Sequence, residues 1–145
     1  PGAGMRGASM GGPFMPPELY RKFFRPRHAA LCDHVHRHSG MRTFLHCCGA
    51  IHALLPDLIG AGFEVINPVQ ISAGRMEPRH LKDAYGNRLV FWGGGVSTQT
   101  TLPFGSVAQV AEETARNTSI FGRGGGFVFA TDQNIQPAVP VENIL

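Results

Sequence analysis

Four short apolar segments of this chain alternate with segments of helical pattern, and this alternation limits what the chain can fold into. Strands that follow one another through helices form right-handed crossovers and a parallel sheet. A complete barrel of this kind needs about 250 residues, whereas the chain has 145. The predicted fold class is therefore α/β, with about half of a (β/α)8 TIM barrel built from four parallel βα units. The expected strands are residues 43–47, 63–67, 88–92 and 127–130.

Proline and glycine set the expected limits of the helices. A first helix starts near Pro17, is interrupted at Pro26 and ends near Gly40. The longest helix begins at Ser106, and Gln109 completes a capping box. Shorter helices are expected at residues 51–59, between Glu77 and Gly86, and from Glu142. The predicted apolar face of the longest helix consists of Val107, Val110, Ala111, Thr114, Thr118 and Phe121.

Residues 1–12 contain five glycines, which predicts a loop or a frayed end, and residues 13–145 form the half barrel. The chain does not begin with Met, and it stops where a helix starts, so we expect it to be a piece of something longer. An isolated half barrel would expose two sheet edges and one open face. A missing N-terminal half-barrel or a homodimer is therefore the expected partner.

The composition excludes several classes of function. A hydrophobic content of 43% with 16% charged residues is typical of a globular protein. We expect no membrane partner, because no apolar run approaches the ~20 residues that span a bilayer. We expect no signal peptide, because residues 1–12 contain no apolar h-region. The Lys and Arg residues, which give the chain a net charge of +3, are scattered and are not interleaved with aromatic residues. We therefore expect no nucleic acid as a partner. Three cysteines without disulfide spacing indicate the cytoplasm.

The tripeptide His46-Cys47-Cys48 follows the first expected strand. Residues two apart on a strand point to the same side, so the imidazole of His46 and the thiol of Cys48 should face each other. Nitrogen and sulfur ligands are typical of zinc, and this pair is half of a zinc site. The alternative is a buried histidine beside a small buried cysteine. Cys47 should point the opposite way and pack in the core.

Several stretches, in order along the chain, resemble the C-terminal half of the uroporphyrinogen decarboxylase superfamily. This superfamily also contains zinc-dependent methyltransferases that take methyl groups from corrinoid proteins. The resemblance implies the same (β/α)8 barrel that the alternation predicts. The stretches are residues 12–20 (GPFMPPELY), 44–49 (FLHCCG), 54–59 (LLPDLI), 66–70 (INPVQ), 88–96 (RLVFWGGGV), 102–105 (LPFG), 134–137 (NIQP) and 139–144 (VPVENI).

The resemblance implies that His46 and Cys48 are zinc ligands and that a third ligand lies near Gln133. Relatives carry Cys or His there, and a neutral amide is a poor zinc ligand. Asp132, Cys47 or a residue outside the chain are the other choices for this position. A second departure is Ser97, where relatives place an acidic residue.

Three functions remain open, and the resemblance implies the first two. The first is methyl transfer from a corrinoid protein or a small methyl donor to a thiol at a zinc site. The second is uroporphyrinogen decarboxylation, a carboxy-lyase reaction in porphyrin biosynthesis that needs no metal. The third is a truncated, inactive domain that needs a partner half.

A small-molecule substrate is expected at the carboxyl ends of the strands. Polar side chains at or just beyond these ends are the predicted substrate-binding residues. They are Asn67, Gln70, Gln99 and Gln136. The alternative is that these side chains hydrogen-bond to the backbone of the loops.

Overall fold

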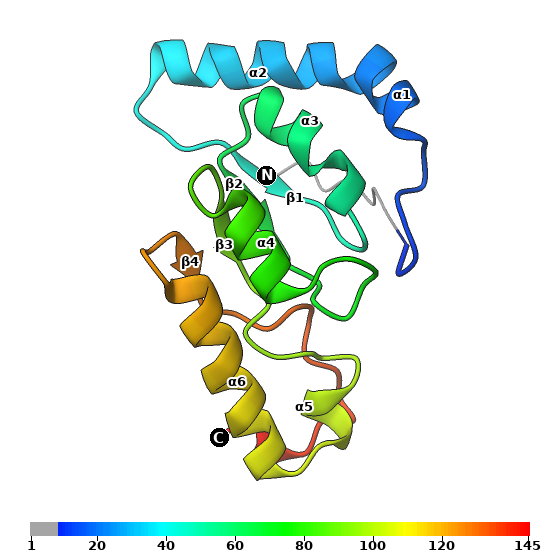
Figure 1. The fold of residues 1–145 in the computed structure, drawn as a ribbon, viewed down its shortest axis with the longest axis vertical. Helices are drawn as coiled ribbons and strands as arrows, with labels where there is room; N and C mark the ends of the chain where they lie inside the picture. The colour runs from blue at the N-terminus through cyan, green and yellow to red at the C-terminus, as the bar shows by residue number, and fades with distance from the viewer. Residues whose placement is uncertain (1–8) are drawn as a thin grey trace.

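The computed structural model describes residues 9–145, and within them four strands form one parallel sheet in the order β1-β2-β3-β4 (Figure 1). The order along the sheet is the order along the chain, as the alternation predicts. Each strand is shorter than expected, because only two or three residues of each expected stretch pair in register with a neighbour. The strands are β1 (Phe44–His46), β2 (Val65–Asn67), β3 (Val90–Trp92) and β4 (Phe127–Val128).

One row of side chains across the sheet faces the helices. Leu45 pairs in register with Ile66, Ile66 with Phe91, and Phe91 with Phe127. The first three are buried in the main core, against which Phe127 packs. Each such side chain stabilises the fold by roughly 1.5–3 kcal/mol on burial. The helices contribute Leu54, Leu55, Leu58, Leu81 and Phe121 to the same cluster.

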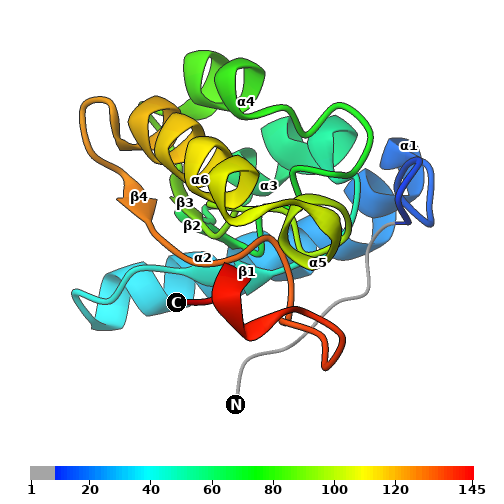
Figure 2. The same ribbon diagram turned by 90° about the horizontal axis from the view of Figure 1, so that it is seen from below.

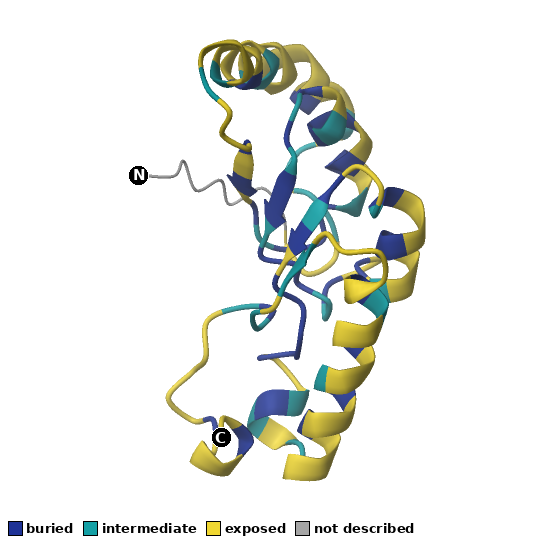
Figure 3. Cartoon of the chain, turned by 90° about the vertical axis from the view of Figure 1, so that its left-hand side faces the viewer, coloured by how far each residue is buried: buried dark blue, intermediate teal, exposed yellow. Residues whose placement is uncertain are grey.

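The opposite row of the sheet is largely open to solvent. Phe44 of β1 remains 45% exposed and Trp92 of β3 41% exposed, although their rings meet edge to face at 5.5 Å. Figure 1 shows α3 and α4 in front of the strands, and Figure 3, turned by 90°, shows the helices along one side of them. In a closed barrel this open row would face the interior. The chain therefore forms part of a barrel, with four of its strands.

The helices occupy the predicted stretches, with two differences: α5 (Thr101–Phe104) was not predicted, and the first helix is not interrupted at Pro26. The first helix continues through the proline, because a wide π-helical turn precedes it and removes the clash that a regular turn would have. Figure 2 views these helices from below. The helical elements are α1 (Pro17–Leu19), η1 (Tyr20–Phe24), α2 (Arg25–His38), η2 (His52–Leu54), α3 (Leu55–Gly60), α4 (Pro78–Tyr85), α5 (Thr101–Phe104), α6 (Val107–Gly122) and η3 (Val141–Asn143).

Helix α6 has the predicted capping box between Ser106 and Gln109, but its buried face differs from the prediction. Val110 and Phe121 are buried as expected, whereas Val107, Ala111 and Thr118 are exposed. The prediction was wrong for these three because polar side chains take their place. The buried residues of α6 are Val110, Glu113, Asn117 and Phe121.

Residues 1–8 lie outside the part of the chain that the structure describes, so only the end of the predicted loop is visible. Ser9 donates its backbone N–H to the carbonyl of Gly12 at 2.8 Å and closes a turn. Ala50 then donates to the carbonyl of Ser9, also at 2.8 Å, which holds this turn against the segment after β1. The proposed boundary at residue 12 stays a prediction. Among residues 9–145, no helix combines the length and apolar character needed to cross a membrane.

Candidate functional site

The candidate site begins at the carboxyl end of β1. His46 is the last residue of the strand, and Cys48 lies two residues further on. The sulfur of Cys48 is 3.3 Å from Nε2 of His46. The imidazole is exposed and the thiol is half-buried. This geometry confirms the predicted orientation of the pair, whose role as zinc ligands stays a prediction.

Cys47 lies on the other side of the backbone from this pair. It is 1% exposed and belongs to the main core, as the alternation along the strand predicts. Its backbone N–H donates to the carbonyl of Asn67 at 2.7 Å and extends the pairing of β1 with β2. The two adjacent thiols therefore have different environments, and Cys48 is the one that solvent can reach.

Asn67 of β2 reaches the imidazole from the neighbouring strand. It pairs in register with His46, and its Oδ1 lies 2.7 Å from Nδ1 of His46. Its Nδ2 donates to the carbonyl of Trp92 at 3.2 Å. Three strands thus contribute to one chain of polar contacts that ends at the sulfur of Cys48.

Gln70 is close to the site but is committed to the backbone. It is buried, and its Oε1 accepts the N–H of Gly49 at 2.9 Å. Its Nε2 contacts the sulfur of Met10 at 3.0 Å. This amide fixes the turn that follows Cys48, which gives it a structural task beside the predicted one. Substrate binding by Gln70 remains untested.

Asp132 does not join His46 and Cys48. It is fully buried in the segment that follows β4. Its Oδ1 accepts from the N–H of Thr98 at 2.7 Å and from the hydroxyl of Thr98 at 2.8 Å, and its Oδ2 accepts from Ser72 at 3.1 Å. This carboxylate ties together the segments that follow β2, β3 and β4.

Gln133, the other choice for the third ligand, is half-buried next to Asp132. Its backbone carbonyl accepts from the hydroxyl of Thr131 at 2.6 Å. Among residues 9–145, no group of three or more His, Cys, Asp or Glu side chains is placed to hold a metal ion. A catalytic zinc ion takes three protein ligands and keeps one position open. Among residues 9–145, His46 and Cys48 can therefore fill two of the three protein-ligand positions, and the third is unfilled.

A glycine-rich segment after β3 shapes the neighbouring part of this edge. Gly93 and Gly94 have φ angles of 103° and 84°, which disfavour other residues. A Cβ at Gly95 would lie 2.4 Å from the ring of Phe129. Two side chains of α6 hold this segment. Asn117 donates to the carbonyl of Gly95 at 3.2 Å, and Glu113 accepts the N–H of Ser97 at 3.1 Å.

Sequence reasoning missed Glu113 and Asn117. The signal available in the sequence was the spacing of these two polar residues, four apart on one helix, together with the Gly-Gly-Gly segment at residues 93–95.

Two of the predicted substrate-binding residues have no contact with His46 or Cys48 among the hydrogen bonds described. Gln99 is exposed in the segment before α5, where its N–H donates to the hydroxyl of Ser97 at 3.2 Å. Gln136 is exposed and donates to the carbonyl of Asn134 at 3.0 Å. Their predicted role remains untested.

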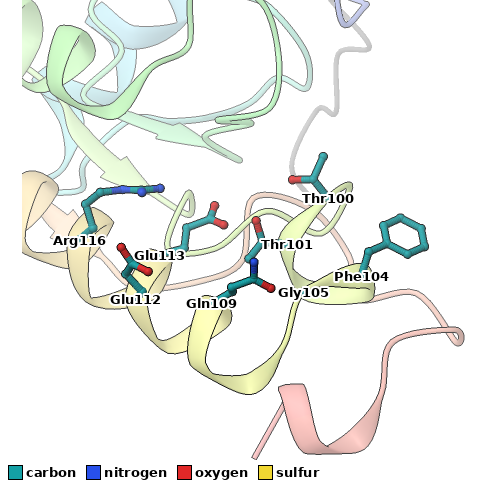
Figure 4. Close-up of a pocket in the computed structure, with 8 residues that line it drawn as sticks. All are labelled: Thr100, Thr101, Phe104, Gly105, Gln109, Glu112, Glu113 and Arg116. Carbon is teal, nitrogen blue, oxygen red and sulfur yellow. The ribbon is translucent and has the colours of Figure 1, made fainter.

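The structure also has a hollow of about 370 Å³ between α5 and α6. Figure 4 shows Glu112, Glu113 and Arg116 projecting from α6 beside Thr100 and Thr101. None of the predicted site residues lines this hollow.

Comparison with known proteins gives a consistent result. Residues 9–145 match the family model described as "Uroporphyrinogen decarboxylase (URO-D)". A methylcobamide:CoM methyltransferase, MtaA, from Methanosarcina barkeri is 30% identical over 130 residues. A solved methyltransferase structure from Methanosarcina mazei superposes with a TM-score of 0.63 at 27% identity. The matches to these two methyltransferases each cover 90% of this chain but 35% of the relative, so the chain spans about a third of their length.

Proposed function

Because the chain belongs to the uroporphyrinogen decarboxylase family, we propose that it carries the metal-binding edge of a methyltransferase of this family. The reaction transfers a methyl group from a corrinoid protein, or from a small methyl donor, to the thiol of a small-molecule substrate. The similarity to two methyltransferases of Methanosarcina supports this choice over decarboxylation.

The observation that carries the proposal is the pair of donor atoms after β1. Nε2 of His46 and the sulfur of Cys48 are 3.3 Å apart at the carboxyl end of a barrel strand. Catalytic groups of (β/α)8 barrels lie at this end. Imidazole nitrogen with thiolate sulfur is a donor set that suits zinc.

In this proposal His46 and Cys48 are the two zinc ligands that this chain supplies. Cys48 contributes its thiolate and His46 its Nε2 lone pair, while Cys47 packs in the core. When zinc is bound, it supplies thiol activation, since a coordinated thiol is deprotonated at neutral pH. Asp132 holds the surrounding loops in place. The cytoplasm suits such a site, because its thiols stay reduced there.

The remaining ligands come, in this proposal, from outside residues 9–145. The relatives are much longer than this chain. The face of the sheet that carries His46 is also open, with Phe44 and Trp92 partly exposed. An N-terminal half-barrel, or a second copy of the chain, would cover this face and bring further donors to the same edge.

Zinc analysis of the protein at its natural length tests the proposal. We expect about one zinc ion per chain in the unmodified protein and loss of this zinc in Cys48→Ala and in His46→Ala. Cys47→Ala is the matched control, since it removes the neighbouring thiol from the core and should leave the zinc content unchanged. Circular dichroism verifies that each variant is folded.

Methylcobalamin serves as the methyl donor in the second part of the experiment. Its visible spectrum changes when the methyl group leaves, so transfer to a small thiol can be followed directly. Loss of this change in Cys48→Ala, but not in Cys47→Ala, is the expected result. Equal zinc content in the unmodified protein and in Cys48→Ala would overturn the proposal.

A further inference from the structure

The amide of Asn67 lies between two groups that together fix its orientation. The carbonyl of Trp92 can only accept a hydrogen bond, so the Asn67 atom 3.2 Å from it must be the NH2 group. The oxygen of the same amide then points at His46, 2.7 Å from its Nδ1. An amide oxygen can only accept, so Nδ1 of His46 carries the proton.

This protonation has a consequence at the other ring nitrogen. With the proton on Nδ1, a neutral imidazole has its lone pair on Nε2. Nε2 is the atom that faces the sulfur of Cys48 at 3.3 Å. The lone pair is therefore held in the direction in which His46 would bind a metal ion shared with Cys48.

We infer that Asn67 is a positioning residue that fixes the tautomer and the orientation of the His46 ring for metal binding at Nε2. This inference rests on the proposed function for its use, but the tautomer itself can be measured without metal. It gives Asn67 a role that acts through His46, whereas the direct substrate contact expected from its position at a strand end stays a prediction. Replacing such a partner of a metal-bound histidine typically weakens metal binding about 10–100-fold.

Two variants and one control separate this role from a general effect on the fold. Asn67→Ala removes the acceptor for Nδ1. Asn67→Asp keeps an acceptor oxygen at nearly the same place, but it loses the bond to Trp92 and adds a negative charge. Asn87→Ala, an exposed amide just before β3, is the matched control. Asn67→Val, whose side chain favours strands, replaces Asn67→Ala if that variant does not fold.

The first measurement is the position of the ring proton of His46, in long-range 1H–15N NMR spectra of the zinc-free natural-length protein at pH 8. We expect the Nδ1–H form in the unmodified protein, in Asn67→Asp and in Asn87→Ala. In Asn67→Ala the population should shift toward the Nε2–H form. An unchanged Nδ1–H population in Asn67→Ala overturns the inference.

The second measurement is zinc affinity, by competition with a chromogenic chelator. Asn67→Ala should bind zinc about 10–100-fold more weakly, whereas Asn67→Asp and Asn87→Ala should stay within a few-fold of the unmodified protein. If zinc binds but Asn67→Ala has unchanged affinity, the positioning role is refuted and the proposed function stands. If the protein binds no zinc, the proposed function fails and the tautomer alone decides the inference.

Discussion

Removing the buried carboxylate of Asp132 should destabilise the fold without acting on metal binding. Hydrogen bonds to charged groups contribute about 1.5–3 kcal/mol each, and Asp132 accepts three, two from Thr98 and one from Ser72. The two hydroxyl donors can turn to other acceptors. The backbone N–H of Thr98 is held in place, and leaving such a donor buried without an acceptor costs about 1–3 kcal/mol.

We therefore expect Asp132→Ala to lower the free energy of unfolding by about 2–4 kcal/mol. Asp132→Asn keeps one oxygen for Thr98 and should lower it by about 1–2 kcal/mol. Urea denaturation at pH 7, followed by circular dichroism, measures both values. Asp83→Asn is the matched control, because its carboxylate pairs with Arg123 on the surface and such pairs contribute at most about 1 kcal/mol.

Zinc binding by folded Asp132→Asn distinguishes this structural role from that of a ligand. The expected zinc affinity equals that of the unmodified protein. A loss of zinc like that expected for Cys48→Ala would show that Asp132 is the third ligand. An unfolding free energy of Asp132→Ala equal to that of the unmodified protein would refute the energetic reasoning.

Three further predictions concern stability. Burial acts to raise the pKa of Glu64, but hydrogen bonds, chiefly from Arg42, hold it at about 2. Glu64→Gln should thus cost about 1–2 kcal/mol above pH 4.5, and the difference in urea denaturation should vanish as the pH falls toward 2. Burial lowers the pKa of His52. The contribution of its neutral ring to stability is therefore complete above pH 6.5 and is lost as the pH falls below that value. Melting curves of His52→Asn should depend less on pH than those of the unmodified protein. Gly94→Ala forces a side chain into φ 84° and should cost about 1–2 kcal/mol in urea denaturation, whereas Gly122→Ala, which meets open space, should not.

The sheet could be predicted because its signal is local. Apolar segments alternating with helical ones determine a parallel order without knowledge of contacts, and the structure confirms this order. The strand ends could not be predicted, since pairing depends on how a neighbour aligns. Arg88 was expected in a strand, but β3 begins at Val90, where it pairs with Val65.

The buried face of α6 shows where periodicity fails. Thr118 fits an apolar stripe in the sequence but is exposed, whereas Asn117 is buried. The reason lies 22 residues away, at the carbonyl that Asn117 reaches on Gly95. The hydropathy pattern of a helix contains no information about a hydrogen-bond partner in another segment. It therefore predicts that a polar residue such as Asn117 is exposed, although its contact with that partner buries it.

At the candidate site, too, the features that follow from local spacing could be predicted, and those that depend on contacts between segments could not. The common direction of His46 and Cys48 follows from their spacing on one strand, and so does the burial of Cys47. The contacts of Asp132 and Gln70 depend on which loops meet at the carboxyl edge of the sheet. A sequence shows that these residues are polar and follow strands, but it does not show whether they face a ligand or a backbone N–H.

The described residues leave both the metal site and one face of the sheet incomplete, and the two lie on the same side of the sheet. The donor pair of His46 and Cys48 has no third ligand among residues 9–145, and the row that carries Phe44 and Trp92 is open. A row of barrel strands that covered these rings would run beside β1 and end at its carboxyl edge, because strands of a (β/α)8 barrel are parallel. Ligands at those strand ends would then face Cys48. The same added strands would therefore stabilise the apolar face and complete the metal site, so zinc affinity and resistance to unfolding should rise together when a partner half is supplied.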